Sequence, residues 1–172
     1  MRGYGLIIAL VACASAAAGF ERFTTGPVID THGPVAKVAE ATMPEQATFK
    51  IAFDVAEAAV AGKQSRALES AARLLNMHAQ AGLSPDATAV AIVVHGAAAL
   101  DLVNDERYGG ENASAALVAA LVDAGVSIQL CGQTAAYRDI AQDDLLPGVT
   151  LSVSAMTAHA LLQQDGYTLY PF

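Results

Sequence analysis

The feature that most constrains the fold is an alternation, from Phe49 onward, between short apolar runs and longer segments with the periodicity of amphipathic helices. Residues 89–94 are the clearest apolar run, since none of their side chains is polar. Such a run is typical of a strand that helices cover on both faces. Because crossover connections between parallel strands are right-handed, the alternation predicts a three-layer α/β/α sandwich with a mainly parallel five-stranded sheet, of the flavodoxin-like class.

Turn signals between these segments give the expected bounds of the elements. The strands are expected at residues 49–54, 89–94, 126–130, 149–153 and 167–172. The helices are expected at residues 65–81, 112–124, 134–138 and 154–164, with Ser65, Asn112 and Ser154 as N-caps. A polar loop is expected at residues 104–110. The first helix has a polar face that we expect to be solvated, which carries Glu69, Arg73, Asn76 and Gln80.

Residues 1–18 have the pattern of a secretory signal peptide. A positive N-terminus precedes an apolar stretch at residues 4–12, and small residues follow it. We expect cleavage after Ala16 or Ala18 and export to the periplasm, because the stretch is shorter than the roughly 20 apolar residues of a membrane-spanning helix. A lipid-anchored form is the alternative, because the four residues that end at Cys13 have the form of a lipobox.

The rest of the 172-residue chain has the length of one domain. Residues 19–46 show little periodicity and are expected to form an extended N-terminal arm, which could wrap a neighbouring subunit. The arm carries the turn-forming pairs Gly26-Pro27 and Gly33-Pro34. Residues 47–172 are expected to form the α/β domain, with a sizeable core, because 54% of the chain is apolar.

The charge balance excludes one class of partner. The chain has 9 basic against 17 acidic residues and a formal net charge of -8. This charge repels phosphate backbones and anionic lipid headgroups, so no nucleic acid is expected as a partner. In the mature chain no transmembrane helix is expected either.

Polar or reactive side chains follow four of the predicted strands at the point where each strand ends. They are Asp54, His95, Cys131 and Ser154. Because the carboxyl ends of parallel strands meet at one edge of a sheet, where ligands bind in such folds, we expect these residues to lie close together. This edge is the candidate functional site.

Cys131 is the candidate reactive residue. Removal of the signal peptide leaves it as the single cysteine, so an internal disulfide is impossible. A thiol at a strand-to-helix turn faces the positive end of the helix, which favours the thiolate, and the amides of Gln133 and Thr134 could donate to the sulfur. Gly132 allows a close backbone approach. A buried, inert cysteine is the equally weighted alternative.

The other strand-end residues have two readings each. His95 could act as a base or hold the thiolate as a cation, or it could only cap a turn. Asp54 could orient His95 or bind a cation, although a strand-end aspartate more often binds its own loop. Ser154 is explained by its role as a helix cap, and no G-x-S-x-G elbow surrounds it, so a serine hydrolase is not expected.

No cofactor is predicted. The four histidines show no metal-ligand spacing, so no metal site is expected. Neither a G-x-G-x-x-G motif after the first strand nor a Walker loop is present, which leaves nucleotide cofactors unsupported. No C-x-x-C motif is present, so a dithiol mechanism within one chain is excluded.

Several short segments in combination resemble the DsrE/DsrF-like family, and the resemblance runs from Phe49 to Phe172. The segments are Leu74 to Gly82, Val93 to Gly96, Leu130 to Gln133, Ser154 to Thr157 and Gln163 to Tyr167. The resemblance implies a five-stranded α/β/α fold and assembly into trimers or hexamers. It also implies, from the sulfur-relay members, a cysteine that carries persulfide sulfur between partner proteins, and Cys131 is the counterpart of that cysteine.

The relay members are cytoplasmic, whereas this chain is expected to be exported, which puts a cytoplasmic sulfur donor in doubt. The expected function is therefore a periplasmic homo-oligomer that binds or relays sulfane sulfur through Cys131, with His95, Gln133 and Asp54 in support and a donor or acceptor protein as partner. The alternatives are a non-catalytic oligomeric module that binds a small ligand, and a thiol redox sensor. A depressed thiol pKa and high exposure favour chemistry, and full burial favours the binding module.

Overall fold

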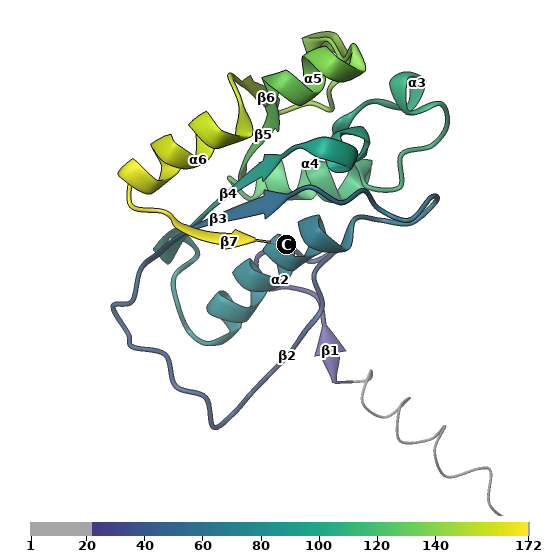
Figure 1. Cartoon of the computed structure of the whole chain (residues 1–172). Helices are drawn as coiled ribbons and strands as arrows, with labels where there is room; N and C mark the ends of the chain where they lie inside the picture. The colour runs from purple at the N-terminus through teal and green to yellow at the C-terminus, as the bar shows by residue number, and fades with distance from the viewer. Residues whose placement is uncertain (1–21, 172) are drawn as a thin grey trace, which may run out of the picture.

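The computed structural model describes residues 22–171, and Figure 1 traces the chain. The predicted signal peptide at residues 1–18 and the alternative lipid attachment at Cys13 lie outside the described residues. Within the part of the chain that is described, no helix has both the length and the apolar composition needed to cross a bilayer.

A five-stranded sheet forms the middle layer of the domain, and all of its strand pairs are parallel (Figure 1). Its strands are β3 (Phe49–Val55), β4 (Thr88–Val94), β5 (Ser127–Cys131), β6 (Val149–Ser152) and β7 (Thr168–Pro171). Their order across the sheet is β6-β5-β4-β3-β7. Each strand begins and ends within one residue of its expected bounds, and the predicted fold class is confirmed.

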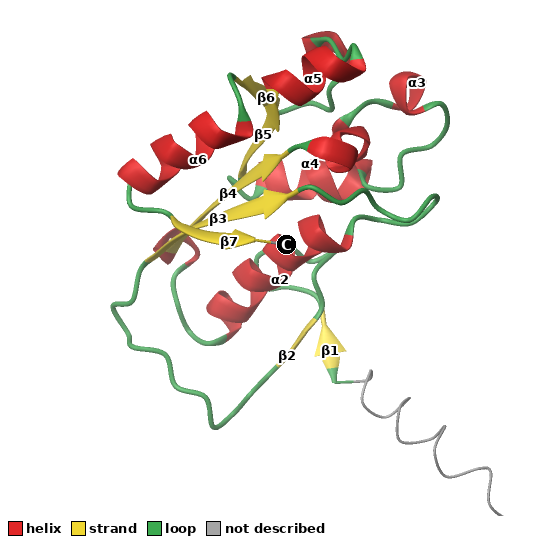
Figure 2. Cartoon of the chain, in the orientation of Figure 1, coloured by secondary structure: helices red, strands yellow, loops and turns green. Residues whose placement is uncertain are grey.

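Helices cover both faces of this sheet (Figure 2). The long helix α2 (Arg66–Gln80) contacts α4 (Ala115–Asp123) on one face, and α6 (Ala155–Gln164) lies on the other. The short helix α5 (Gly132–Arg138) begins directly after β5. The remaining turns of helix are η1 (Pro85–Ala87), η2 (Gly96–Leu102), α3 (Asp105–Tyr108) and η3 (Gln142–Asp144).

Two of the three predicted N-caps are confirmed. The side chains of Ser65 and Ser154 accept hydrogen bonds from the amides of Leu68 and Thr157. The third prediction is wrong, because α4 begins at Ala115 and not after Asn112. Asn112 is buried and instead donates to the carbonyls of Asp101 and Val103, with its own oxygen accepting from the Ser114 amide. The expected loop at 104–110 also contains the one-turn helix α3.

The N-terminal arm packs on α2 of its own chain. It contains the two-stranded ribbon of β1 (Phe23–Thr24) and β2 (Val35–Ala36). Between them, Asn76 binds the arm backbone through five hydrogen bonds. Its Oδ1 accepts from the amides of Val28 and Ile29, and its Nδ2 donates to the carbonyls of Ile29, His32 and Gly33. Asn76 is fully buried, so the expectation that it lies on a solvated face is wrong, because the arm covers that face.

Gly33 permits this close packing. A Cβ atom at Gly33 would lie 2.6 Å from the backbone of Ala72 and Arg73 in α2, and its φ of +67° is a conformation that other residues rarely adopt. Ile29 and Val35, on either side, are buried in the core. Residues 28–35 therefore belong to the packed structure of the domain.

Candidate functional site

The strand register brings the predicted site residues to one edge of the sheet. Val94 pairs with Leu130, so His95 and Cys131 follow at the same level on adjacent strands, and neighbouring strands are about 4.8 Å apart. Asp54 lies on the next strand, opposite Val93. The convergence expected from the strand ends is present in the structure.

A cavity of about 330 Å³ opens at this edge, between the carboxyl ends of the strands and the first turns of α5 and α6. It is lined by Asp54, His95, Cys131, Gln133, Thr134, Ser154, Ala155, Met156 and His159. The four candidate residues from the sequence, Asp54, His95, Cys131 and Gln133, therefore all line one cavity. The cavity also holds a residue that the sequence analysis did not select, His159.

Hydrogen bonds to the sulfur lower the pKa of the Cys131 thiol. Burial raises the pKa of the Cys131 thiol, but the hydrogen bonds lower it by more, so that the net pKa lies below the ordinary value of a thiol. The donors are the backbone amides of Thr134, Ala155 and Gln133 and the hydroxyl of Thr134. Because they come from the first turns of α5 and of α6, the two helices converge on one sulfur atom.

Cys131 combines a feature of each reading that the sequence left open. The residue is only 6% exposed, as a packed cysteine would be. It nevertheless lines the open cavity and has a lowered pKa, as a reactive cysteine does. Its burial is unfavourable for a disulfide with the same residue of another chain.

Gly132 confirms the expected close approach. A side chain at this position would run into the carbonyl oxygen of Ser152 on β6. The backbone after Cys131 can therefore turn into α5 in close contact with β6. This turn holds the backbone amides of Gln133 and Thr134 near the sulfur.

Asp54 binds two histidines through a single oxygen. Its Oδ1 accepts from Nε2 of His95 at 3.1 Å and from Nε2 of His159 at 2.9 Å. These contacts join β3, the end of β4 and α6. Asp54 therefore contacts His95, as the reading in which it orients this histidine requires.

His159 is the functional-site residue that sequence reasoning missed. Its side chain is 13% exposed, and Nδ1 is buried and has no hydrogen-bond partner among the described residues. The sequence carried a weak signal, because His159 lies in the second turn of the helix that follows a strand-end cap. His78, the histidine of α2, instead contacts Thr88 at 2.8 Å and packs against the ring of Phe49.

The remaining lining residues have structural roles. The side-chain amide of Gln133 donates to the carbonyl of Val153. It is therefore the backbone N–H of Gln133 that donates to the Cys131 sulfur. Ser154 caps α6, as predicted. The hydroxyl of Thr134 also accepts from the amide of Gly96, which connects α5 to the turn after His95.

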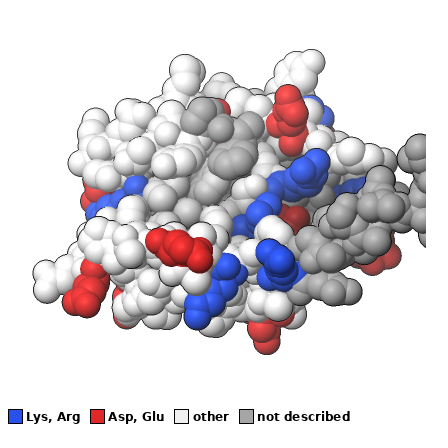
Figure 3. Space-filling model, turned by 90° about the horizontal axis from the view of Figure 1, so that it is seen from below, with Lys and Arg blue, Asp and Glu red and all other residues white. Residues whose placement is uncertain are grey.

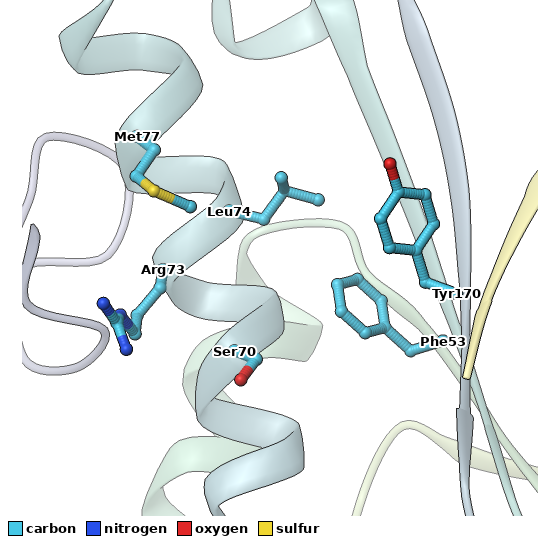
Figure 4. Close-up of a pocket in the computed structure, with 6 residues that line it drawn as sticks. All are labelled: Phe53, Ser70, Arg73, Leu74, Met77 and Tyr170. Atoms are coloured by element: carbon cyan, nitrogen blue, oxygen red, sulfur yellow. The ribbon is translucent and has the colours of Figure 1, made fainter. Parts of the chain in front are cut away.

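Other features of the described surface carry less chemistry. A second cavity, of about 260 Å³, lies between α2 and the sheet and is lined by Phe53, Ser70, Arg73, Leu74, Met77 and Tyr170 (Figure 4). Among residues 22–171, no group of three or more histidine, cysteine or acidic side chains is arranged to hold a metal ion. The face seen from below carries acidic and basic side chains beside a broad uncharged area (Figure 3).

Comparisons with known proteins agree with this fold. A model of the DsrE/DsrF-like family matches residues 44–172. The structure of the protein of unknown function MTH1491 from Methanobacterium thermoautotrophicum is 21% identical and covers 72% of this chain and 99% of its own, with a TM-score of 0.56. The crystal structure of the E. coli ychN protein is 18% identical and covers 73% of this chain and 100% of its own, also with a TM-score of 0.56. At such identities these two likenesses show the fold alone. No curated protein matches the chain.

Proposed function

The chain belongs to the DsrE/DsrF-like family, and from that premise we propose that it binds or relays sulfane sulfur through Cys131. The observation that carries the proposal is the thiol itself: it lines an open cavity, and donors from two helices lower its pKa. A thiolate is the form that attacks a sulfane sulfur. The same donors can stabilise the negative charge of a persulfide on Cys131.

The proposal includes a place of action and a form of assembly. The pattern of residues 1–18 supports export to the periplasm. Family membership supports a homo-oligomer, of trimer or hexamer size, and a donor or acceptor protein as the sulfur partner. In the periplasm that donor has to be an exported protein or a small sulfur compound.

One measurement tests the central step. Protein expressed from the full sequence is alkylated with iodoacetamide over a range of pH, and its intact mass is read before and after incubation with inorganic polysulfide. We expect alkylation to report a thiol pKa below the ordinary value, and the mass to rise by one sulfur atom. With Cys13 absent from both proteins, through removal of the leader or a Cys13→Ser change, the Cys131→Ser variant should show neither effect.

A second candidate function is favoured by the 6% exposure of Cys131. In that case the protein is a non-catalytic module that binds a small ligand in the 330 Å³ cavity. The Cys131 thiol then only packs as one of the lining residues of that cavity. An unreactive thiol and an unchanged mass would favour this function and contradict the sulfur carrier. A redox sensor would instead gain oxygen on treatment with peroxide.

A further inference from the structure

We propose that Asp54, His95 and His159 form a proton-holding triad that serves Cys131, in which His95 is the acid and His159 is a positioning residue. The inference rests on the proposed sulfur transfer and assigns the proton that the transfer needs. The observation behind it is one carboxylate oxygen that accepts from two imidazoles, in the cavity that also contains the thiol.

The hydrogen bonds fix the tautomers. A carboxylate only accepts, so Nε2 of His95 and Nε2 of His159 both carry the proton that they donate to Asp54. Each ring then has only Nδ1 left to gain or lose a proton. The chemistry of the triad therefore depends on the surroundings of the two Nδ1 atoms.

These surroundings differ. Nδ1 of His159 is buried and has no partner among residues 22–171, so a second proton there would create a buried N–H without an acceptor. The ring of His95 is 33% exposed, and its Nδ1 is not among the buried atoms that lack a partner. An additional proton is therefore held by His95 and not by His159. The Nε2 atom of the same ring lies 3.1 Å from Oδ1 of Asp54.

Few other charges act on this triad. The titratable side chains that line the cavity are Asp54, His95, Cys131 and His159. From α5, Arg138 donates through Nε to the carbonyl of Gly96, beside His95. On the far side, β7 pairs with β3 and brings Tyr170 opposite Phe53, not Asp54.

The sulfur transfer shows where the proton is used. The Cys131 thiolate attacks the outer sulfur of a persulfide R–S–SH. A bond forms between the Cys131 sulfur and that outer sulfur, and the S–S bond of the donor breaks. The electron pair of the broken bond stays on R–S⁻, which takes a proton from the His95 imidazolium and leaves as R–SH. Cys131 then carries the –S–SH group, and His95 is neutral.

Thiosulfate provides a contrast in leaving group. When Cys131 takes the outer sulfur of thiosulfate, the bond to the sulfonate breaks and sulfite departs with the electron pair. Sulfite is a weaker base than an alkyl thiolate, and it leaves without a proton from the protein. The triad should therefore accelerate transfer from an alkyl persulfide and leave transfer from thiosulfate almost unchanged.

The test places the same substitution at both histidines. Glutamine can keep a donor near the Nε2 position but cannot hold an extra proton. With glutathione persulfide as donor, His95→Gln should slow the persulfidation of Cys131 by about 100-fold, within the range of a lost general acid. His159→Leu should slow it by roughly tenfold through misplacement of Asp54, and His159→Gln should restore most of the rate. With thiosulfate, all of these variants should stay near the wild-type rate.

The pH dependence provides a readout that a merely structural role would not change. The deficit of His95→Gln should be largest at acidic pH and disappear as pH rises, because the wild-type imidazole then becomes neutral as well. The control is His78→Gln, a helix histidine outside the cavity, which should behave as wild type. Circular dichroism and the iodoacetamide rate of each variant establish that the fold and the thiol are intact.

The outcomes separate the triad from the proposed function. Wild-type protein that gains sulfur from no donor would contradict sulfur handling itself. If wild type gains sulfur, the triad is overturned by a wild-type persulfide rate in His95→Gln, or by equal losses with persulfide and thiosulfate. Equal losses in His95→Gln and His159→Gln would overturn the division of roles between the two histidines.

Discussion

Two clusters of polar side chains are built into this fold, and they differ in how completely their hydrogen bonds are satisfied. Under the N-terminal arm, Asn76 is fully buried and makes five hydrogen bonds to backbone groups. At the edge of the sheet, Asp54 and His95 are each about a third exposed, and His159 keeps one buried nitrogen without a partner. The first cluster is fully satisfied and stabilises the fold, whereas the second keeps a buried nitrogen that no described residue satisfies.

The largest effect is expected from breaking the satisfied cluster. Asn76→Leu leaves buried amides and carbonyls of residues 28–33 without partners, each of which costs about 1–3 kcal/mol. We expect the free energy of unfolding to fall by about 4 kcal/mol, and the arm to become sensitive to proteases. Urea denaturation and limited proteolysis measure these two effects.

The control for this variant is Gln164→Leu, which removes an exposed amide at the end of α6 and should change stability by less than about 0.5 kcal/mol. An Asn76→Leu protein as stable as the control would contradict this expectation, because it would mean that water satisfies the arm backbone once the Asn76 side chain is removed.

Thr134→Val sharpens the comparison at the thiol. The variant removes the hydroxyl that donates to the Cys131 sulfur and keeps the shape of the side chain. Because this donor lowers the thiol pKa, its loss raises the pKa, and the alkylation rate at neutral pH falls severalfold. The rate is measured with iodoacetamide from acid to alkaline pH. Thr150→Val on β6 is the matched control, and a pH profile identical to that control would contradict the role of the hydroxyl.

A third polar group, Asp101, permits an intermediate test. Asp101 is buried and accepts from the amide of Ala59, and burial raises its pKa in spite of this bond. A carboxyl with a raised pKa in the folded state contributes stability at acidic pH that is lost as pH rises through the folded pKa. Asp101→Asn keeps an acceptor and removes the charge. We expect stability at neutral pH to rise by up to about 1 kcal/mol.

The measurement for Asp101→Asn is urea denaturation at several pH values. The fall in stability between acid and neutral pH should be smaller in the variant than in wild type. Asp123→Asn, at an exposed position, serves as the control. Parallel curves of stability against pH for wild type and Asp101→Asn would contradict the raised pKa of Asp101.

The smallest effect on stability is expected at the incompletely satisfied cluster. His159→Leu removes one donor to Asp54, but Asp54 keeps His95 and is partly hydrated, and the orphaned Nδ1 disappears as well. The free energy of unfolding should change by less than about 1 kcal/mol. Thermal unfolding measures the change, and a loss as large as that of Asn76→Leu would mean that the two clusters do not differ in kind.

The sequence predicted those parts of the structure that depend on neighbours along the chain. Ser65 and Ser154 were recognised as caps because a cap binds an amide three residues away. Asp54, His95 and Cys131 were placed together because parallel strands end at one edge. The bounds of the strands followed from the same apolar runs that build the core.

The misses involve contacts between distant segments. Asn76 has the pattern of a solvated helix face, and only the arm, more than 40 residues earlier, makes it a buried position. His159 reaches Asp54 across 105 residues, and no local pattern specifies that contact. Asn112 has the chemistry of a cap, but its side chain instead binds the carbonyls of Asp101 and Val103, at the end of η2.

The oxygen of Asp54 that two histidines share has a consequence for protein engineering. A graft of residues 130–138 into another scaffold would transfer the thiol and the amides of α5, but neither Asp54 nor the amide of Ala155. The smallest segment that could be grafted with the complete site is therefore the whole sheet together with α5 and α6. For the same reason, a loop exchanged elsewhere in the protein preserves the chemistry only if β3, β4 and α6 keep their relative positions to within a fraction of an ångström.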